Sequence, residues 1–242
     1  MKAMVLAAGL GTRLRPLTNN RPKALVEVAG RTMLEIALAR LRTFGIDEVI
    51  INVHHFADMV VDYLRANQNF GMRIEISREE ALLDTGGGLK NAAHFFLQHR
   101  DADQPFILHN VDVMSTIDLH RAVQFHTASH ALATLVVQQR ETSRYLLFDE
   151  SHQLCGRQSG IDGNPELVRS ASKRQALAFC GIHVISPRLL NMISEVGVFP
   201  IVPVYLRLSS QGQNILAFRA DGSYWRDLGT PERIAQAAVD LP

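Results

Sequence analysis

The sequence predicts an α/β domain built on a mainly parallel sheet, with helices on both faces. Short apolar runs of the buried-strand type alternate with segments whose apolar residues recur at helical spacing. This alternation is typical of parallel sheets, because parallel strands need helical crossovers between them. The chain has 242 residues, 47% of them apolar, so one domain over residues 1–242 can bury a sizeable core.

The first part of the chain shows the alternation most clearly. An apolar run at residues 3–7 predicts the first strand, and a long basic loop with glycine and proline follows at residues 9–22. Thr32 is expected to open a helix, because Glu35 three residues later completes a possible capping box. The other elements expected up to residue 137 are strands at 24–28, 48–53, 72–77, 106–109 and 131–137, and helices at 57–66, from the turn at 84–88 to about 98, and from Asp118.

Residues 140–185 interrupt the alternation. Strand-like runs at 145–148 and 176–185 enclose a polar stretch, so we expect an insertion or excursion that covers one edge of the sheet. A last helix is expected from Thr230, with Pro231 in its first turn.

Composition and charge exclude several classes of function. Lys and Arg number 25 and Asp and Glu 24, so no global field would hold nucleic acid and any phosphate contacts are local. The apolar run at the N-terminus is too short for a signal peptide or a membrane span, which favours a cytoplasmic protein without a membrane partner. The two cysteines, Cys155 and Cys180, lack metal-ligand spacing and are expected to be packed thiols.

The segment from Leu6 to Leu17 is the most informative motif. It follows the first expected strand, and Gly9 and Gly11 would let backbone N–H groups approach a phosphate closely. It lacks the third glycine of a dinucleotide-binding fingerprint, and Pro16 opposes the helix that such a fingerprint opens. It also lacks the Gly-Lys-Ser/Thr of a Walker loop. A phosphate site of another kind and an ordinary strand-to-helix turn are the two interpretations left.

Three cations lie in or just beyond this loop. Arg13 and Arg15 belong to it, and Lys23 follows Pro22. Arginine offers a fork that matches phosphate oxygens, and lysine acts as a compact charge. The pattern therefore favours a polyphosphate site over a solvated basic loop.

Two aspartates are candidate metal ligands. Asp112 follows the strand expected at 106–109, and Asp227 lies in the extended segment before the last helix. Ligands of parallel sheets bind at the carboxyl ends of the strands, and Mg²⁺ prefers a few carboxylates plus substrate phosphate oxygens and water. Helix N-caps are the competing interpretation, and the residues alone leave both open.

A second glycine turn is expected at residues 84–88, which include three consecutive glycines. Such a turn lets a flat or charged ligand approach the backbone, although an unliganded flexible turn has the same pattern. Glu79, just upstream, is either an acceptor for a base N–H or a solvated carboxylate.

These motifs resemble the signature of the sugar-1-phosphate nucleotidyltransferases, the nucleotide-sugar pyrophosphorylases. The likeness includes Ala-Gly-x-Gly-Thr-Arg-Leu, Pro-Leu-Thr and Pro-Lys-Ala-Leu between residues 6 and 25. It continues through 29–30, 84–88, 110–112, 179–182 and 225–232, and so covers nearly the whole chain. The chain is most similar to the short bacterial type, which includes N-acetylmuramate 1-phosphate uridylyltransferases and heptose or mannose 1-phosphate guanylyltransferases.

The resemblance implies a Rossmann-like αβα sandwich without a C-terminal β-helix, because no residues remain for that tail. It implies nucleotidyl transfer from a nucleoside triphosphate to a sugar 1-phosphate, with Mg²⁺ as cofactor and pyrophosphate as the second product. UTP and N-acetylmuramate 1-phosphate are the favoured substrates. Guanylyl transfer to mannose or heptose 1-phosphate is the alternative. The excursion at 140–185 would lie on the sugar side.

The resemblance also implies roles for single residues. Arg13 would bind the leaving β- and γ-phosphates, and Lys23 would bridge the α-phosphate and the sugar phosphate. Asp112 and Asp227 would hold the metal, which makes Asp112 the third catalytic residue beside Arg13 and Lys23. The residues implied to contact the nucleotide are Ala7, Ala8, Gly9, Gly11, Thr12, Arg13, Lys23, Gly86, Gly87 and Asp112.

Val111 departs from the family pattern, which usually has glycine before the first aspartate. This departure is the one feature that favours a different class of function, a non-catalytic protein that binds nucleotide-sugars. The four cations and carboxylates that the reaction needs are all present in the sequence.

Overall fold

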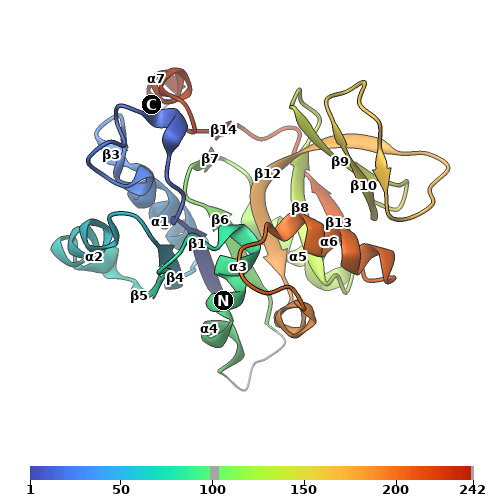
Figure 1. Ribbon diagram of the computed structural model, residues 1–242, viewed down its shortest axis with the longest axis horizontal. Coiled ribbons are helices and arrows are strands. Elements are labelled where there is room, and N and C mark those ends of the chain that lie inside the picture. Colours follow the sequence, from blue (N-terminus) through green and yellow to red (C-terminus); the bar gives the residue numbers. More distant parts are fainter. Residues whose placement is uncertain (99–103, 241–242) are drawn as a thin grey trace.

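The computed structural model describes residues 1–98 and 104–240. Within these ranges the main sheet has ten strands in the order β11-β10-β9-β12-β6-β1-β4-β5, and β8 and β13 branch from β12 (Figure 1). The strands from β6 to β5 are all parallel and form the core that the alternation predicts. They are β6 (Phe106–Asn110), β1 (Lys2–Leu6), β4 (Glu48–Val53) and β5 (Arg73–Arg78).

β12 makes the sheet mixed. It runs antiparallel to β6 on one side and to β8 on the other, and β13 pairs in parallel with β8. The start of β12 also pairs with β9, and β10 and β11 extend the sheet further in antiparallel pairs, at the upper right of Figure 1. The bounds are β8 (Ala133–Gln138), β9 (Arg144–Phe148), β10 (Leu154–Ser159), β11 (Glu166–Leu167), β12 (Gln175–Ile185) and β13 (Ile215–Arg219).

Helices cover both faces of the sheet, because side chains of a strand alternate between its faces. Ala3 and Val5 of β1 pack in one core and Met4 in the other, all fully buried. The Rossmann-like αβα sandwich is therefore confirmed. The first core is covered by α1 (Met33–Thr43), α2 (Ala57–Ala66), α5 (Leu119–Ala128) and α7 (Pro231–Asp240), and the second by α3 (Asp84–Asn91), α4 (Ala93–Leu97) and α6 (Ile201–Ser210).

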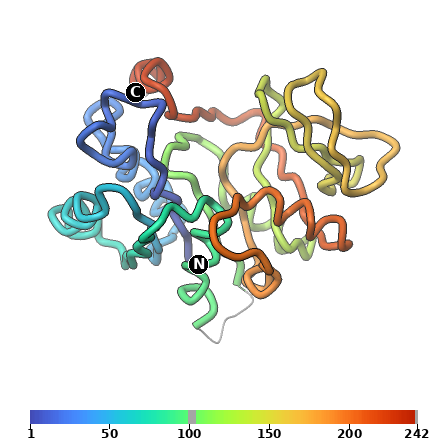
Figure 2. Tube along the Cα trace, viewed as in Figure 1, coloured from blue at the N-terminus to red at the C-terminus, as the bar shows by residue number. Residues whose placement is uncertain are grey.

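The last helix lies beside an early segment of the chain. α7 packs against β2 (Glu27–Val28), and Figure 2 shows the last helix beside the first part of the trace. This contact brings Asp227, just before α7, to the end of the sheet that carries the glycine-rich loop. A segment more than 200 residues away from that loop therefore contributes to the same region.

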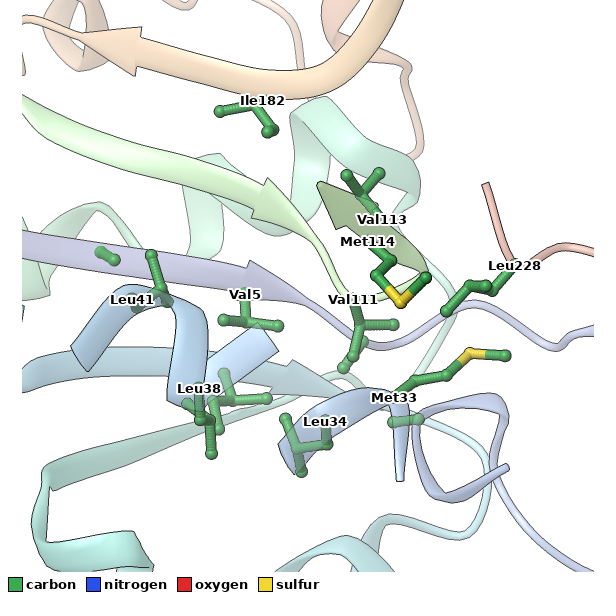
Figure 3. Close-up of a cluster of buried hydrophobic side chains, with 14 of the residues drawn as sticks. Val5, Met33, Leu34, Leu38, Leu41, Val111, Val113, Met114, Ile182 and Leu228 are labelled. Carbon is green, nitrogen blue, oxygen red and sulfur yellow. The ribbon is translucent and has the colours of Figure 1, made fainter. Parts of the chain in front are cut away.

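The helical spacing of leucines in α1 is explained by the core. Leu34, Leu38 and Leu41 are fully buried and lie beside Val5 of β1 in Figure 3. Burying one such side chain contributes roughly 1.5–3 kcal/mol. Thr32 caps this helix as expected, because its side chain accepts a hydrogen bond of 3.1 Å from the Glu35 N–H.

The strand expected at 24–28 is wrong over its first half. Lys23–Leu25 form a 3₁₀ turn, η2, and only β2 (Glu27–Val28) is extended, paired with β3 (Arg31–Thr32). Ala24 and Leu25 are buried in this turn, and a short buried apolar run has the same sequence pattern as a strand. Two other 3₁₀ segments flank the site and the second core, η1 (Thr12–Leu14) and η4 (Pro187–Met192), and a third, η3 (Gln68–Gly71), follows α2.

Both cysteines are buried free thiols, which confirms the expectation for Cys155 and Cys180. Burial raises the pKa of the Cys180 thiol to about 12, so this side chain is uncharged at neutral pH. No helix in the described part of the chain combines the length and the apolar character needed to cross a membrane.

Candidate active site

The candidate site lies where the parallel strands end. Leu6, the last residue of β1, is in register with Asn52 of β4 and with Asn110 of β6. The segments that follow these strands therefore leave the sheet at the same edge, which is where α/β folds bind their ligands. The glycine-rich loop follows β1 and Asp112 follows β6, so both lie at this edge.

Gly11 fixes the shape of the glycine-rich loop. Its φ is +64°, a conformation that L side chains rarely adopt. A Cβ at this position would also lie 2.9 Å from Thr18 Cγ2 and 3.0 Å from Lys23 Cβ. Because Gly11 has no side chain, the loop can fold back onto the aliphatic part of the Lys23 side chain.

Lys23 and Asp112 form an ion pair through Lys23 Nζ and Asp112 Oδ2. Their side chains are 12% and 15% exposed, so the pair is largely shielded from water but open on one side. Both residues line a cavity of about 410 Å³. Other residues lining this cavity include Ala8, Gly9, Asn52, Glu79, Asp84, Thr85, Asn110 and Val198.

Asp227 is brought beside Asp112 by a small two-stranded sheet. β7 (Val113–Ser115) pairs antiparallel with β14 (Trp225–Asp227), and the Leu228 N–H donates a 2.8 Å hydrogen bond to the Asp112 carbonyl. The N-cap interpretation of these aspartates is wrong, because α5 is capped by Asp118 and α7 begins only at Pro231.

A second cavity, of about 510 Å³, holds the charged groups. Asp112 and Asp227 line it together with four arginines. Asp227 Oδ2 pairs with Arg233 Nη1 at 3.1 Å, and its Oδ1 accepts a 2.6 Å hydrogen bond from the Gly229 N–H. The four arginines are Arg13, Arg140, Arg144 and Arg233.

Gly229 allows Arg13 and Asp227 to approach each other. A Cβ there would lie 2.8 Å from Arg13 Nη2 and 2.5 Å from Asp227 Oδ1. Gly229, the Arg13 guanidinium and the Asp227 carboxylate therefore lie close together. An excess of cations around two carboxylates suits a ligand that carries several negative charges.

A buried chain of hydrogen bonds holds the part of the site around the first cavity. Asn52 Oδ1 accepts from the Ala7 N–H at 2.8 Å, and Asn52 Nδ2 donates to Glu79 Oε1 at 2.7 Å. Glu79 Oε2 accepts from the Leu83 N–H at 2.9 Å. The chain links the ends of β1, β4 and β5, so Glu79 is a structural acceptor as well as a wall of the first cavity.

The three consecutive glycines lie inside α3 and not in a turn before it. The N–H groups of Gly86 and Gly87 both donate to the Phe199 carbonyl, at 3.0 and 3.1 Å. A Cβ at Gly86 would lie 2.5 Å from the Phe199 ring. These glycines therefore allow close packing of α3 on the segment before α6, and Asp84 and Thr85 line the first cavity in their place.

The structure thus brings together most, but not all, of the expected site residues. Ala8, Gly9, Arg13, Lys23, Asp112 and Asp227 line the two cavities. Ala7, Gly11, Thr12, Gly86 and Gly87 do not line them. Asn52, Arg140 and Arg144 also line the cavities and were not expected there, because their only signal was a polar residue at the end of a strand or beside one. Asn110 had been noted only as part of the 110–112 segment that resembles the family.

Val111 does not need to be glycine in this chain. Its φ is not positive, and its side chain is 4% exposed and lies among Met33, Leu34 and Met114 in Figure 3. Its N–H donates to the Leu6 carbonyl at 3.1 Å. The side chain thus fills the core beneath the site and leaves Asp112 in place.

A sequence profile of the nucleotidyl transferase family matches residues 2–242. The chain belongs to the nucleotidyl transferase family. The expected recognition is therefore confirmed at the level of the family.

Curated nucleotidyl transferases are similar over the whole chain. The N-acetylmuramate alpha-1-phosphate uridylyltransferase of Caulobacter vibrioides is 35% identical over 99% of this chain and 96% of its own length. The protein of the same name from Neisseria meningitidis serogroup B is 31% identical over 98% and 96%. Mannose-1-phosphate guanylyltransferase 1 of Arabidopsis thaliana is 30% identical over 96% of this chain and 62% of its own.

Solved structures share the fold of this chain. HddC from Yersinia pseudotuberculosis complexed with GMP-PN superposes with a TM-score of 0.76 at 19% identity, covering 100% of this chain and 99% of the other. A putative glucose-1-phosphate thymidylyltransferase from Bacillus anthracis gives 0.79 at 18% identity, covering 99% and 94%. At these identities the likeness establishes the αβα architecture alone.

Proposed function

We propose that this nucleotidyl transferase joins UTP and N-acetylmuramate 1-phosphate to give UDP-N-acetylmuramate and pyrophosphate. The carrying observation is the position of the Lys23–Asp112 pair, which lines the first cavity while Asp112 also lines the arginine-rich second cavity. A nucleoside in the first cavity would therefore present its phosphates to the second. Two full-length relatives at 31% and 35% identity that bear the uridylyltransferase name support the choice of substrates.

The reaction needs no protein nucleophile. A phosphate oxygen of the sugar 1-phosphate attacks the α-phosphorus of UTP, and the bond from that phosphorus to the β-bridging oxygen breaks, releasing pyrophosphate. Catalysis then consists of positioning and charge neutralisation. Lys23 stabilises the charge on the α-phosphate, and Arg13 holds the departing phosphates.

The donor set of the second cavity fits Mg²⁺. Asp112, just before β7, and Asp227, at the end of the neighbouring strand β14, supply hard carboxylate oxygens, and neither carboxylate caps a helix. When bound, the ion would neutralise phosphate charge and polarise the phosphorus–oxygen bonds. We expect chelator-treated protein to lose turnover and Mg²⁺ to restore it, with Asp227→Asn requiring a higher Mg²⁺ concentration than the wild type.

Guanylyl transfer to a hexose or heptose 1-phosphate is the second candidate. The Arabidopsis relative at 30% identity favours it, and so does the carboxylate of Glu79 in the wall of the first cavity. A carboxylate is a suitable acceptor for paired N–H donors of guanine. A non-catalytic role loses its one supporting feature, since Val111 has a place in the core.

The test is pyrophosphate release with each of UTP, GTP, CTP, dTTP and ATP against a panel of sugar 1-phosphates. The panel includes N-acetylmuramate, N-acetylglucosamine, glucose, mannose and heptose 1-phosphates. The proposal predicts release only when both partners are present, with the highest kcat/KM for UTP and N-acetylmuramate 1-phosphate. A maximum for GTP with mannose or heptose 1-phosphate would replace it by the second candidate, and nucleotide binding without release would favour the non-catalytic role.

A further inference from the structure

A third cavity, of about 530 Å³, adjoins the nucleotide cavity. The two share Asp84, Thr85 and Asn110. The third also shares Asn110, Arg144 and Phe179 with the arginine-rich cavity. Asn110 therefore stands where all three meet. Given the proposed function, on which this inference rests, the nucleoside and the phosphates occupy the first two cavities and the sugar occupies the third.

The walls of this third cavity come mainly from the antiparallel strands of the excursion. Gln158, Ser159 and Asn164 supply neutral polar groups, which suit sugar hydroxyl and acetamido groups. β9 and β10 also place two arginines there, Arg144 and Arg157. The charges of these arginines decide which kind of sugar the cavity accepts.

The two arginines differ in their partners. Arg157 Nε pairs with Glu166 Oε2 at 2.6 Å, so its charge is compensated within the protein. The Arg144 side chain has no ion pair or hydrogen bond with the described residues, although its backbone N–H donates to Thr142 Oγ1. Asp84, the acidic residue shared with the nucleotide cavity, accepts the Thr85 N–H at the start of α3, where the helix dipole stabilises its charge.

We propose that Arg144 binds a carboxylate on the sugar and thereby selects a sugar 1-phosphate that carries a second acidic group. N-acetylmuramate has such a group in its lactyl ether, whereas N-acetylglucosamine, mannose and heptose are neutral away from the phosphate. A guanidinium fork matches a carboxylate in geometry and charge. The pairing would also supply the partner that Arg144 lacks within the described residues.

The same cation could instead bind a substrate phosphate, because Arg144 also lines the arginine-rich cavity. The two uses differ in a measurable way. Every sugar 1-phosphate carries the phosphate, so a phosphate contact would serve all sugars equally. A carboxylate contact would serve only the acidic sugar.

The test compares kcat/KM for N-acetylmuramate 1-phosphate and for N-acetylglucosamine 1-phosphate, with saturating UTP, in wild type and Arg144→Gln. We expect the ratio of acidic to neutral sugar to fall about tenfold or more, through the KM for the acidic sugar, because a hydrogen-bonded charge is lost. Because Arg144 also lines the arginine-rich cavity, the kcat/KM for the neutral sugar can fall too, but by a smaller factor than the kcat/KM for the acidic sugar. Arg144→Lys should retain most of the ratio.

Arg174→Gln is the matched control. Arg174 is an exposed arginine near the start of β12 and lines none of the three cavities, so its loss should leave the ratio unchanged. An equal fall for both sugars in Arg144→Gln, or an unchanged ratio, would overturn the role of Arg144 while leaving the proposed function in place. A wild-type protein that turns over only neutral sugars would overturn both.

Discussion

Lys23 carries the largest share of the proposed chemistry of any single residue. The position of Lys23 depends on Gly11, which leaves room for the aliphatic part of the lysine side chain. The Lys23 ammonium forms an ion pair with Asp112. Because the pair is largely buried, a change at either residue leaves the other charge without its partner. The residue is thus positioned before any substrate binds.

Replacing Lys23 by Met should lower kcat by about 10²–10³, the usual cost of removing one group that stabilises transition-state charge. The assay is steady-state pyrophosphate release with UTP and N-acetylmuramate 1-phosphate. Lys173→Met is the control, because Lys173 is exposed and pairs only with the exposed Glu150 among the described residues. Near-normal turnover of Lys23→Met would show that the role assigned to Lys23 is wrong.

The site residues that could be predicted from the sequence lie in local motifs. Arg13 and Asp112 follow strands β1 and β6, so the expected parallel sheet already placed them on one edge. Lys23 was predicted from its nearness to the glycine-rich loop, although the strand expected to follow it is wrong over its first half. Arg144 was not predictable as a site residue, because its place depends on how β9 and β12 pair across the sheet. No local pattern in a polar stretch fixes that register.

Helix α3 is the element in which sequence and structure differ most. Its glycines had been expected to form a turn that exposes backbone to a ligand. Gly86 and Gly87 are instead buried against Phe199 and Gly197, more than 100 residues further along the chain, and a contact of that range leaves no local signal. Gly88 is buried against Glu79 and Asn52.

Gly88→Ala should therefore destabilise the protein. An alanine favours a helix interior by about 1 kcal/mol over glycine. Its Cβ would, however, lie 2.7 Å from Glu79 Oε1 and 2.8 Å from Asn52 Nδ2, and such overpacking costs roughly 1–3 kcal/mol. Because these two groups hold the Ala7 N–H and the wall of the nucleotide cavity, the KM for UTP should rise as well.

Urea unfolding and UTP kinetics check this expectation. Gly222→Ala is the control, since a Cβ there meets no atom within 4 Å and its φ is not positive. If Gly88→Ala proved more stable than wild type with an unchanged KM, the close packing of α3 on the Asn52–Glu79 pair would be refuted.

Buried histidines remain neutral in the folded protein, so its free energy of unfolding depends on pH. Burial lowers the pKa of His109 and of His126 to about 4 and that of His183 to about 3, from an ordinary value of 6.5. As pH falls below about 6.5, the unfolded chain takes up these protons and the folded chain does not. The stability present above pH 6.5 is therefore lost progressively toward pH 4, by roughly 1.4 kcal/mol per pH unit for each histidine.

We expect the free energy of unfolding in urea to fall by about 4 kcal/mol between pH 7.5 and pH 5.5 from these three groups. His126→Gln can keep a hydrogen bond to Thr134 or Ser186, which the imidazole contacts at 3.0 Å each, and removes one titrating group. The pH-dependent loss should be about two-thirds as large in this variant. A loss equal to that of wild type would contradict the assignment of the titration to His126.

The proposed uridylyl transfer forms a sugar nucleotide and pyrophosphate, and the most direct measurement follows both products. UTP labelled at the α-phosphate is incubated with N-acetylmuramate 1-phosphate and Mg²⁺, and the labelled sugar nucleotide and the released pyrophosphate are quantified together. We expect the labelled sugar nucleotide and pyrophosphate to appear in equal amounts and only when both substrates are present. Neither product should form with Asp112→Asn. Labelled UMP formed without the sugar phosphate, or no label transferred in the presence of both substrates, would contradict the proposed transfer.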